Sequence, residues 1–383
     1  MDTKTRAERS FDEAQPDLEH LSQWMYDNPE LGYEEFETSR KMAEMLSAGG
    51  FEVEYPAYGL DTAFAARAGT SGPEVIICAE MDALPEVGQA CGHNIIATAG
   101  IGAGLALIDL VDELGIRLTV LGTPAEEHTG GKVDLINAGA FKGAAASMMI
   151  HPAVKDIVDP QFLAIAHVEV DFYGKPSHAS AEPALGINAL DAAVLAYMNV
   201  ATLRQQILDT DRIHGIITRG GAAPNVIPAH TTMVFNVRSV TDERLDELFP
   251  KVEACFAAAA LATGCTYEIR ESGHRYKDLR TDSVIADLYE ENSRELGRTM
   301  NWLADLEPST SGSTDMGNVS HEVPSIHPMI DLNCYPTVNH QPEFAAHTVT
   351  DDGKRIIRDG ALAMAWTIID LADGDRWDDL GQH

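Results

Sequence analysis

Apolar residues recur at two different spacings along the first 150 positions, and these spacings predict alternating helices and strands. Residues 11–50 carry apolar side chains at helical spacing, for example Met42, Met45 and Leu46, with a helix stop at Asn28-Pro-Glu-Leu-Gly32. Farther along, we predict strands at 74–79, 117–122 and 146–151, separated by helices at 95–114 and 133–139. This order predicts an α/β fold whose mostly parallel sheet has helices on both faces.

The pattern changes near residue 164, where apolar and polar residues begin to alternate, as in the stretch His167–Tyr173. After this strand we predict a helix, two strands, a helix and a strand, at 187–207, 214–218, 231–238, 241 onward and 266–270. The order βαββαβ is that of a ferredoxin-like unit. Because the first pattern then returns, we predict one domain from residues 1–163 and 279–383, with residues 164–278 inserted into it.

Composition and charge narrow the class of protein. The 383 residues are 45% hydrophobic, and 27 Lys and Arg stand against 60 Asp and Glu, a net charge of -33. Such a surface repels nucleic acid and anionic membranes, so we expect neither as a partner; its simplest meaning is solubility. No apolar run approaches the ~18 residues of a membrane helix, and the N-terminus does not resemble a signal peptide. The cysteines are too few and scattered for a disulfide framework, so we predict a cytoplasmic protein with reduced thiols.

Metal-binding side chains follow the predicted strands of the first domain. Cys91 and His93 follow the first strand, Glu126-Glu127 the second, and His151 the third. Each alone has an ordinary structural explanation, but the carboxyl ends of neighbouring parallel strands converge on one crevice. Thiol, imidazole and carboxylate ligands suit zinc or manganese. Of two adjacent glutamates, one can bind metal while the other takes a proton from water.

A glycine-rich stretch raises a competing possibility. Gly100-Ile-Gly102-Ala-Gly104 has the look of the glycine turn of a nicotinamide-dependent oxidoreductase. That turn must stand between a strand and a helix, whereas these glycines lie inside a predicted helix. We therefore interpret them as small residues that let the helix pack closely on the sheet.

Several longer motifs are shared with a known family. The chain resembles the two-metal aminoacylase and carboxypeptidase metallohydrolases, which include auxin-conjugate and hippurate hydrolases, p-aminobenzoyl-glutamate hydrolases and β-alanyl dipeptidases. The resemblance covers nearly the whole chain, and its most specific parts are Met81-Asp82-Ala-Leu-Pro85, Ala90-Cys91-Gly-His93-Asn94, Thr123-Pro-Ala-Glu126-Glu127 and Gly174-Lys-Pro-Ser-His178-Ala-Ser180. The sequence Gln89-Ala-Cys-Gly-His-Asn94 departs from the His-Ala-Cys-Gly-His-Asp of the auxin and hippurate branch. It is closer to the p-aminobenzoyl-glutamate and β-alanyl dipeptidase branch.

The resemblance implies two divalent ions per subunit, zinc or manganese, and roles for the site residues. Glu126 is implied as the general base, and Asp82 as the acid that orients a ligand histidine. The implied metal ligands are Cys91, His93, Glu127, His151 and His340. For the last of these, Asn339-His340-Gln-Pro-Glu-Phe344 fits the family pattern better than His347, which is expected at the surface.

The same resemblance implies that the inserted domain is a lid through which the chain forms a homodimer. His178 matches a histidine that polarises the scissile carbonyl, and Asn225 matches a residue that touches substrate. Arg238 matches an arginine that binds the substrate carboxylate. Gly312-Ser313-Thr314-Asp315 resembles a loop that closes the site, so Gly312 and Ser313 are predicted to contact substrate.

These observations predict a metal-dependent amidase that hydrolyses an N-acyl amino acid or a dipeptide-like substrate. The alternative is a catalytically silent relative that uses the same fold for binding or assembly. The intact pair Glu126-Glu127 argues against that alternative, because a silent protein has no need of a general base.

Overall fold

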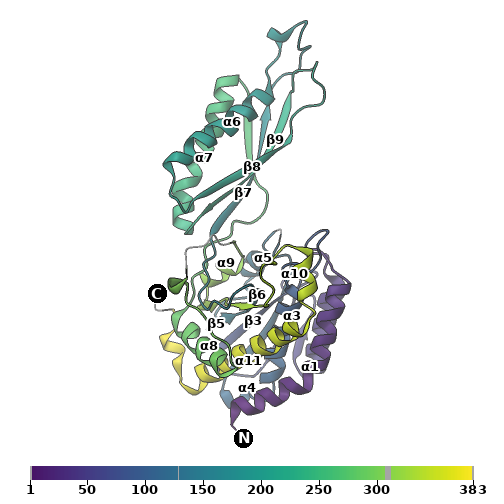
Figure 1. Ribbon diagram of the computed structural model, residues 1–383, viewed down its shortest axis with the longest axis vertical. Coiled ribbons are helices and arrows are strands. Elements are labelled where there is room, and N and C mark those ends of the chain that lie inside the picture. Colours follow the sequence, from purple (N-terminus) through teal and green to yellow (C-terminus); the bar gives the residue numbers. More distant parts are fainter. Residues whose placement is uncertain (1, 128, 307–311, 382–383) are drawn as a thin grey trace. The chain divides into compact units, whose positions relative to one another are not determined.

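The computed structural model describes residues 2–127, 129–306 and 312–381 of the chain. These residues form two compact units (Figure 1). The larger unit contains residues 2–161, 279–306 and 315–381, and the inserted unit contains residues 162–278 and 312–314. Among the described residues, no helix is both long and apolar enough to cross a membrane.

A six-stranded sheet organises the larger unit. Its spatial order is β1 (Glu52–Glu54), β2 (Phe64–Ala68), β4 (Arg117–Thr123), β3 (Glu74–Glu80), β5 (Ala146–Met148) and β11 (Ser325–Ile326). The last four strands of that order run parallel, whereas β2 pairs antiparallel with β4, and β1 with β2. The predicted mostly parallel sheet is confirmed, and the antiparallel pair at its edge was not foreseen.

The predicted single strand at 146–151 is wrong. The chain leaves the main sheet after Met148, and β6 (His151–Ala153) then pairs in parallel with β12 (Met329–Asp331) in a separate two-stranded sheet. A partner from far along the chain thus decides where the strand is divided. The apolar run Met148-Met-Ile150 could not reveal this division.

Helices cover both faces of the main sheet, as the alternation along β3 requires. Val75 and Ile77 belong to one apolar cluster, and Ile76 and Cys78 to another. The first cluster receives α1 (Thr3–Asp27), α2 (Phe36–Ala48), α3 (His93–Leu107), α4 (Val111–Leu114), α8 (Ser283–Glu295), α10 (Pro342–His347) and α11 (Asp351–Asp373). The second receives α5 (Gly131–Asn137) and α9 (Met316–Ser320). Two short 3-10 helices, η3 (Leu303–Asp305) and η4 (Arg376–Asp379), complete the unit.

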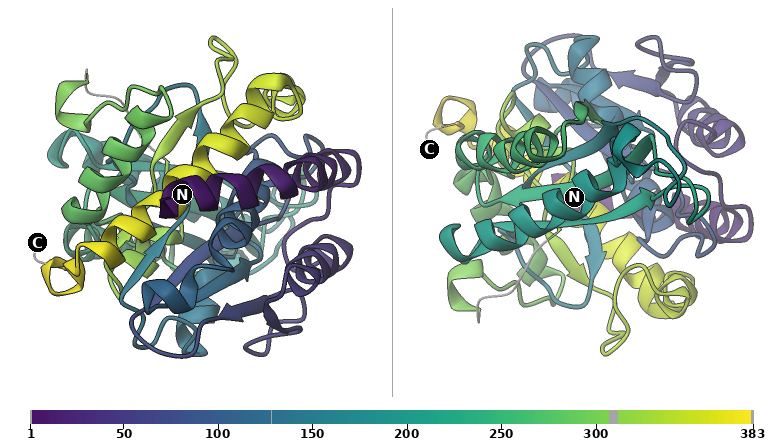
Figure 2. Two further views of the ribbon diagram at one scale, coloured as in Figure 1. Left: turned by 90° about the horizontal axis from the view of Figure 1, so that it is seen from below. Right: turned by 90° about the horizontal axis from the view of Figure 1, so that it is seen from above.

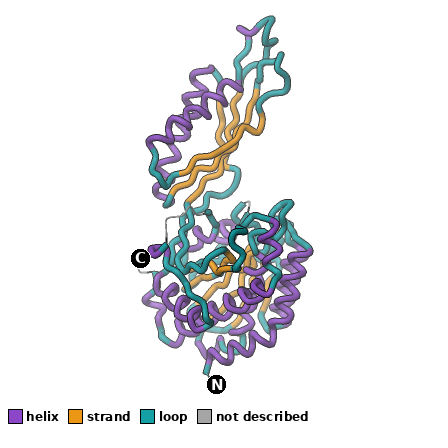
Figure 3. Tube along the Cα trace, in the orientation of Figure 1, coloured by secondary structure: helices purple, strands orange, loops and turns teal. Residues whose placement is uncertain are grey.

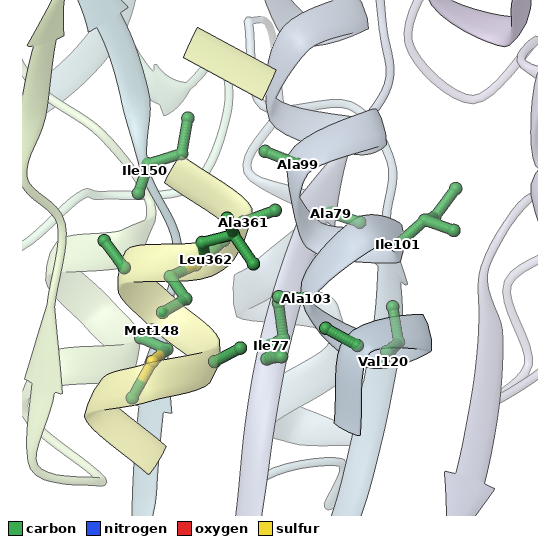
Figure 4. Packing of buried hydrophobic residues seen from close by; sticks show 14 of the residues in the cluster. Ile77, Ala79, Ala99, Ile101, Ala103, Val120, Met148, Ile150, Ala361 and Leu362 are labelled. Carbon is green, nitrogen blue, oxygen red and sulfur yellow. The ribbon is translucent and has the colours of Figure 1, made fainter. Parts of the chain in front are cut away.

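The glycines of α3 allow close packing, as the sequence predicts. A Cβ at Gly104 would lie 2.5 Å from Cγ2 of Val120, and one at Gly102 would lie 2.8 Å from Cε2 of Phe11. The helix therefore touches both the sheet and α1, and Figure 4 shows the packing around Ala103. In Figure 2 (left), α1 is purple and α11 yellow; both contact α3.

The predicted helix at 95–114 is nevertheless two helices. The first helix, α3, ends at Leu107. The chain then turns through residues 108–110, and the second helix, α4, begins at Val111. In this turn the backbone N–H of Leu110 donates to the carbonyl of Leu107 at 2.8 Å. The apolar spacing alone did not reveal the turn.

The inserted unit has the predicted order βαββαβ and is ferredoxin-like. Its elements are β7 (Ala164–Tyr173), α6 (Ala189–Leu203), β8 (Arg212–Arg219), β9 (His230–Ser239), α7 (Asp242–Thr263) and β10 (Thr266–Glu271), with 3-10 helices η1 (Pro183–Leu185) and η2 (Arg204–Gln206) beside α6. The strands form an antiparallel sheet in the order β10-β7-β9-β8. The side chain of Thr241 caps α7 by accepting the N–H of Arg244 at 3.1 Å.

Both helices of the inserted unit lie on one face of its sheet (Figures 2 and 3). Along β7, Val168 and Val170 point into the apolar core under α6 and α7. His167, Glu169 and Asp171 alternate with them and therefore lie on the open face. The part of the open face that β7 forms is accordingly polar.

Candidate metal centre

The predicted site residues of the larger unit lie directly after its strands. Asp82 comes two residues after β3, Glu126 follows β4 by three residues, and His151 begins β6. Cys91 and His93 stand at the start of α3, where Gly92 adopts a left-handed φ of 84°. At this position a Cβ would lie 2.4 Å from Cγ of Pro152, so only glycine allows the close approach.

Four groups of side chains among the described residues could each hold a metal ion, and one of them is Glu80, Glu126 and Asp315. The other three contain the predicted ligands. The first is Cys91, His93 and His151, the second Cys91, Glu127 and His340, and the third His93, Glu126 and Glu127. Within each group the ligand atoms lie within 4.8 Å of one another. The five predicted ligands are thus brought together, whereas His347, half-buried at the end of α10, is in none of the groups found among the described residues.

Asp82 holds the ring of His93 and the backbone of both glutamates. Nδ1 of His93 donates to the backbone carbonyl of Asp82 at 2.7 Å and lies 3.2 Å from its Oδ1. The N–H groups of Glu126 and Glu127 donate to Oδ1 and Oδ2 of Asp82, at 3.1 and 3.0 Å. Burial acts to lower the pKa of His93, but Asp82 and Cys91 raise it well above its usual range. When the ring is neutral, its proton is on Nδ1 and Nε2 presents a lone pair.

The surroundings of Nε2 of His93 indicate whether these residues fit a metal ion. Nε2 is fully buried and has no hydrogen-bond partner among the residues that the structure describes. It lies 3.4 Å from Oε2 of Glu80 and 3.8 Å from Oε1 of Glu127. A buried lone pair facing carboxylate oxygens is unfavourable unless a cation lies between them. The residues therefore fit a divalent cation, and their sulfur, nitrogen and oxygen donors suit zinc or manganese.

The protonation of the ligands follows from their burial. Burial, reinforced by the Glu127 carboxylate, raises the pKa of the Cys91 thiol well above its usual range. Burial lowers the pKa of His151 to about 4, so its imidazole is neutral near pH 7 and its ring can act as a ligand. A bound cation would oppose the effect on Cys91, because it stabilises the thiolate.

Glu126 is placed to accept a proton. Burial, together with the carboxylates of Glu80, Glu127 and Asp315, raises the pKa of Glu126 well above its usual range. A carboxylate with a raised pKa is a stronger base than a solvated one, which is what general-base catalysis requires.

A buried ion-pair cluster beside Glu126 was not predicted. Nζ of Lys132 lies 2.5 Å from Oε1 of Glu80 and 2.7 Å from Oδ1 of Asp315, and all three side chains are at most 1% exposed. Burial acts to raise the pKa of Glu80, but Lys132, His93 and other nearby groups together lower it to about 2. Sequence reasoning places lysine at the surface, so nothing in Gly130-Gly-Lys132 signalled this position.

His327 was also missed. It is fully buried after β11, and its ring centroid lies 5.5 Å from that of His151. Burial lowers its pKa to about 3, so it is neutral near pH 7. It therefore lies beside the predicted ligand His151.

The predicted residues of the inserted unit form two separate groups. At one end, the exposed His178 pairs with Val226, next to Asn225, and its Nδ1 accepts backbone N–H groups from Ser180 and Ala181 at 3.3 and 3.2 Å. Because Nδ1 accepts, the proton of a neutral ring is on Nε2, which is free to donate.

At the other end of the sheet, Nη1 of Arg238 donates to Oγ of Ser313 at 2.9 Å. The carbonyl of Gly312 accepts the N–H of Leu163 at 2.9 Å. Arg238 and Ser313 are 75 residues apart in the chain. The sequence suggested each of them as a substrate-binding residue but did not show that they are in contact.

The sheet register separates these two groups widely. Arg238 pairs with Ile165 near the start of β7, whereas His178 follows Tyr173 at its end. Eight residues of strand at ~3.3 Å each span roughly 26 Å. Within one inserted unit, the two groups cannot touch the same small molecule.

Comparison with known proteins gives a consistent result. A family model described as a peptidase dimerisation domain matches residues 164–263. The chain is 39% identical to the Xaa-Arg dipeptidase of Mus musculus, over 96% of this chain and 88% of that protein. It is 30% identical to a p-aminobenzoyl-glutamate hydrolase of Escherichia coli (strain K12), over 65% of this chain and 56% of that protein.

Among solved structures, a dinuclear metal binding peptidase of the M20 family from Bacillus subtilis has the same fold. The TM-score is 0.71 at 21% sequence identity, and the match covers 94% of this chain and 99% of that one. At this identity the likeness concerns the fold, and it extends through both units.

Proposed function

Because this chain belongs to the M20 family of metal-dependent peptidases and amidases, we propose that it cleaves a dipeptide-like substrate whose leaving amino acid is basic. As a member of that family it is a metal-dependent hydrolase of amide bonds. The relative that matches it over most of both chains is named for the sequence Xaa-Arg. A net charge of -33 favours a cationic substrate over an anionic one.

The observation that carries the proposal is the position of Glu126 among the grouped ligands. We propose that two divalent ions are held by Cys91, His93, Glu127, His151 and His340, with Cys91 common to two of the groups. We favour zinc over manganese because the set includes a thiol. Bound there, the ions would polarise the amide carbonyl and make a water molecule more acidic.

In this mechanism Glu126 takes the proton from the attacking water and returns it to the nitrogen of the leaving amine. Asp82 fixes the direction of the Glu126 carboxylate by holding the N–H groups of residues 126 and 127. Asp82 also keeps the proton of His93 on Nδ1, so that Nε2 faces the ligand group.

Arg238 is proposed to bind the α-carboxylate of the leaving amino acid. Its guanidinium is partly buried, and burial lowers its pKa. No carboxylate lies within 4.0 Å of it in the part of the chain that the structure describes, and its hydrogen bond to Ser313 leaves other donors free. A partly buried guanidinium without an acid partner suits an incoming carboxylate, which it can bind in a bidentate manner.

The separation of roughly 26 Å along β7 implies that two chains build one site. A dipeptide spans only about 7 Å, so His178 and Arg238 cannot both act on it from the same inserted unit. We propose that His178 and Asn225 reach the site of a second copy of the chain. There Nε2 of His178 would donate to the carbonyl oxygen of the scissile amide as negative charge develops on it.

The surface of the inserted unit supports a homodimer formed through it. The strand β8 is at the edge of the sheet, and an unpaired strand edge is a template for pairing. Large apolar side chains are exposed on β8 and α6, namely Ile216, Ile217, Val194, Leu195, Tyr197 and Met198. Ile216 is 64% exposed, which is unusual for a strand residue that stays in water.

Mixing inactive subunits tests the two-chain site. His178→Ala and Glu126→Gln should each be inactive, but a hybrid dimer would contain one site with both residues intact. After subunit exchange, activity should therefore reappear. No recovery, despite exchange demonstrated by differently tagged subunits, would exclude a shared site.

A hydrolysis screen tests the proposed substrate. The protein would be loaded with zinc or manganese and offered Ala-Arg, Ala-Glu, N-acetyl-methionine and p-aminobenzoyl-glutamate. We expect Ala-Arg to give the highest kcat/KM. A preference for p-aminobenzoyl-glutamate would move the leaving residue to an acidic one, and no turnover of any amide would refute the proposed function.

The thiols support the proposed cytoplasmic location. All five cysteines lie in the described part of the chain and are unpaired. Cys91 in addition must stay reduced to act as a ligand. A reducing compartment preserves both features.

A further inference from the structure

The short segment Glu30–Glu35, which the sequence suggested only as a helix stop, packs against the two loops of the metal centre. The backbone carbonyl of Glu30 accepts the N–H of Ala83 at 2.8 Å, one residue after Asp82. The carboxylate of Glu35 accepts the N–H of Ala125 through Oε1, also at 2.8 Å. One segment from the start of the chain therefore contacts the loop after β3 and the loop after β4.

The contact between these segments is tight. A Cβ at Gly32 would lie 3.0 Å from both Cα and Cβ of Ala125, so a larger residue would push the loop after β4 away. Ala125 itself has a φ of 58°, a left-handed conformation that L residues other than glycine adopt only at a cost. Something must hold Ala125 in this conformation.

Three consecutive backbone N–H groups in this loop donate to two buried carboxylates. Ala125 donates to Glu35, and Glu126 and Glu127 donate to the two oxygens of Asp82. Glu35 is 0% exposed and Asp82 is 1% exposed. The conformation from which the side chain of Glu126 projects is thus fixed on two sides.

Retaining an acid at position 35 is costly. Burial, with the nearby Asp82 carboxylate as the second cause, raises the pKa of Glu35 to about 7. An apolar side chain would fill the same volume without that cost. What an apolar side chain lacks is an acceptor for the N–H of Ala125.

We propose that Glu35 is a positioning residue which, by accepting the N–H of Ala125, holds the left-handed turn that directs Glu126 at the substrate. This inference rests on the proposed function, in which Glu126 is the general base. Among the described residues, no hydrogen bond or ion pair joins the side chain of Glu35 to a proposed metal ligand.

Two conservative variants separate the effect of side-chain length at position 35 from the effect of its charge. Glu35→Gln keeps an oxygen at the same distance from Ala125 but removes the charge, whereas Glu35→Asp keeps the charge but shortens the side chain by one methylene. We expect Glu35→Asp to lower kcat by about 10- to 100-fold, because a misplacement of ~1 Å can cost this much. KM and bound metal should stay nearly unchanged, and Glu35→Gln should stay within about threefold of wild type.

The matched controls are Glu34→Asp and Glu34→Gln, since Glu34 is the exposed neighbour of Glu35. Neither should change kcat. If Glu35→Asp kept wild-type kcat, or if Glu35→Gln lost as much as Glu35→Asp, the proposal would be overturned.

A second substitution tests whether Glu35 acts on Glu126 by holding the backbone conformation of Ala125. Glycine adopts positive φ without strain, so Ala125→Gly should hold the turn with less help from Glu35. Added to Glu35→Asp, it should restore kcat by about fivefold, the factor that corresponds to the cost of a left-handed alanine. No recovery in a folded, metal-loaded double variant would contradict the proposed route.

The proposal can fail separately from the proposed function. If wild type cleaved none of the amides offered, the proposed function would fail, yet hydrogen exchange would still report on the turn. In Glu35→Asp the N–H groups of residues 125–127 should exchange faster than in wild type, and in Glu35→Gln they should not. Equal exchange in all three proteins would overturn the role of Glu35.

Discussion

The two units of this protein differ in how closely they gather buried charged side chains. The larger unit gathers Glu80, Asp82, Lys132 and Asp315 and buries all four almost completely. The inserted unit has an apolar core and buries single carboxylates such as Asp211, while on the open face of its sheet Arg270 pairs with Glu169 and remains 46% exposed.

This difference indicates where chemistry takes place. Removing a charge from water costs several kcal/mol, and a protein gains little stability from a buried ion pair. A cluster of several buried charges therefore points to a role beyond stability. In the inserted unit, Arg244 and Arg270 each pair with an acid. Arg238 differs from them, since it is partly buried and has no acid within 4.0 Å among the described residues. This supports the proposal that Arg238 binds a ligand.

The largest expected effect comes from removing the base in the larger unit. Glu126→Gln should lower kcat by roughly 10²- to 10⁴-fold, because the side chain proposed to take the proton is lost. Metal content, measured by elemental analysis, should be retained. Glu127→Gln should instead lower the metal content. Near-normal turnover of Glu126→Gln at saturating metal would exclude this assignment of roles.

Next in size is the loss of the buried cation. Lys132→Met removes the partner of Glu80 and Asp315, and an unpaired buried charge costs about 3–5 kcal/mol of unfolding free energy. Urea unfolding would measure this loss. Lys132→Arg is the matched control, since it keeps the charge but not the fit. A fully stable Lys132→Met protein would show that the cluster tolerates an unpaired acid.

Substitution of Arg238 in the inserted unit should have an intermediate effect. Arg238→Ala should lower kcat/KM by roughly 10- to 100-fold, and Arg238→Lys by less, because a charge-assisted hydrogen bond contributes about 1.5–3 kcal/mol. The comparison to make is a cleaved dipeptide against its C-terminal amide. Wild type should favour the free acid, and Arg238→Ala should have lost that preference. Equal cleavage of both by wild type would rule out carboxylate recognition.

The smallest effect is expected on the open face of the inserted sheet. Arg270→Met removes an exposed partner of Glu169 and Asp171, but Asp171 keeps its hydrogen bonds to His230 and Thr232. Solvent and salt already screen the charge of Arg270, so neither melting temperature nor turnover should change much. A destabilisation as large as that of Lys132→Met would remove the contrast between the two units.

Much of the fold could be predicted from local patterns. The alternation of Val75, Ile76 and Ile77 determines which side chains face each helical layer, and the spacing of βαββαβ elements determines the inserted unit. The expected chemistry was also local, because the residues after each strand must meet at one edge of a parallel sheet. The roles given to individual site residues are still predictions.

Other features depend on contacts between distant parts of the chain. The division of the predicted strand 146–151 depends on β12, and the burial of Lys132 depends on Asp315, which lies 183 residues away. The hydrogen bond from Ala125 to Glu35 spans 90 residues.

The sequence by itself determined the elements, their order and the residue types available for chemistry, because hydrophobic periodicity and strand-end position act over a few residues. Only the tertiary structure decided which buried charges are paired, which backbone N–H groups a carboxylate holds, and that Arg238 and His178 lie at opposite ends of one sheet. These depend on desolvation and on distances of a few ångströms between groups far apart in the chain, and a pattern of neighbours in sequence carries no information about either.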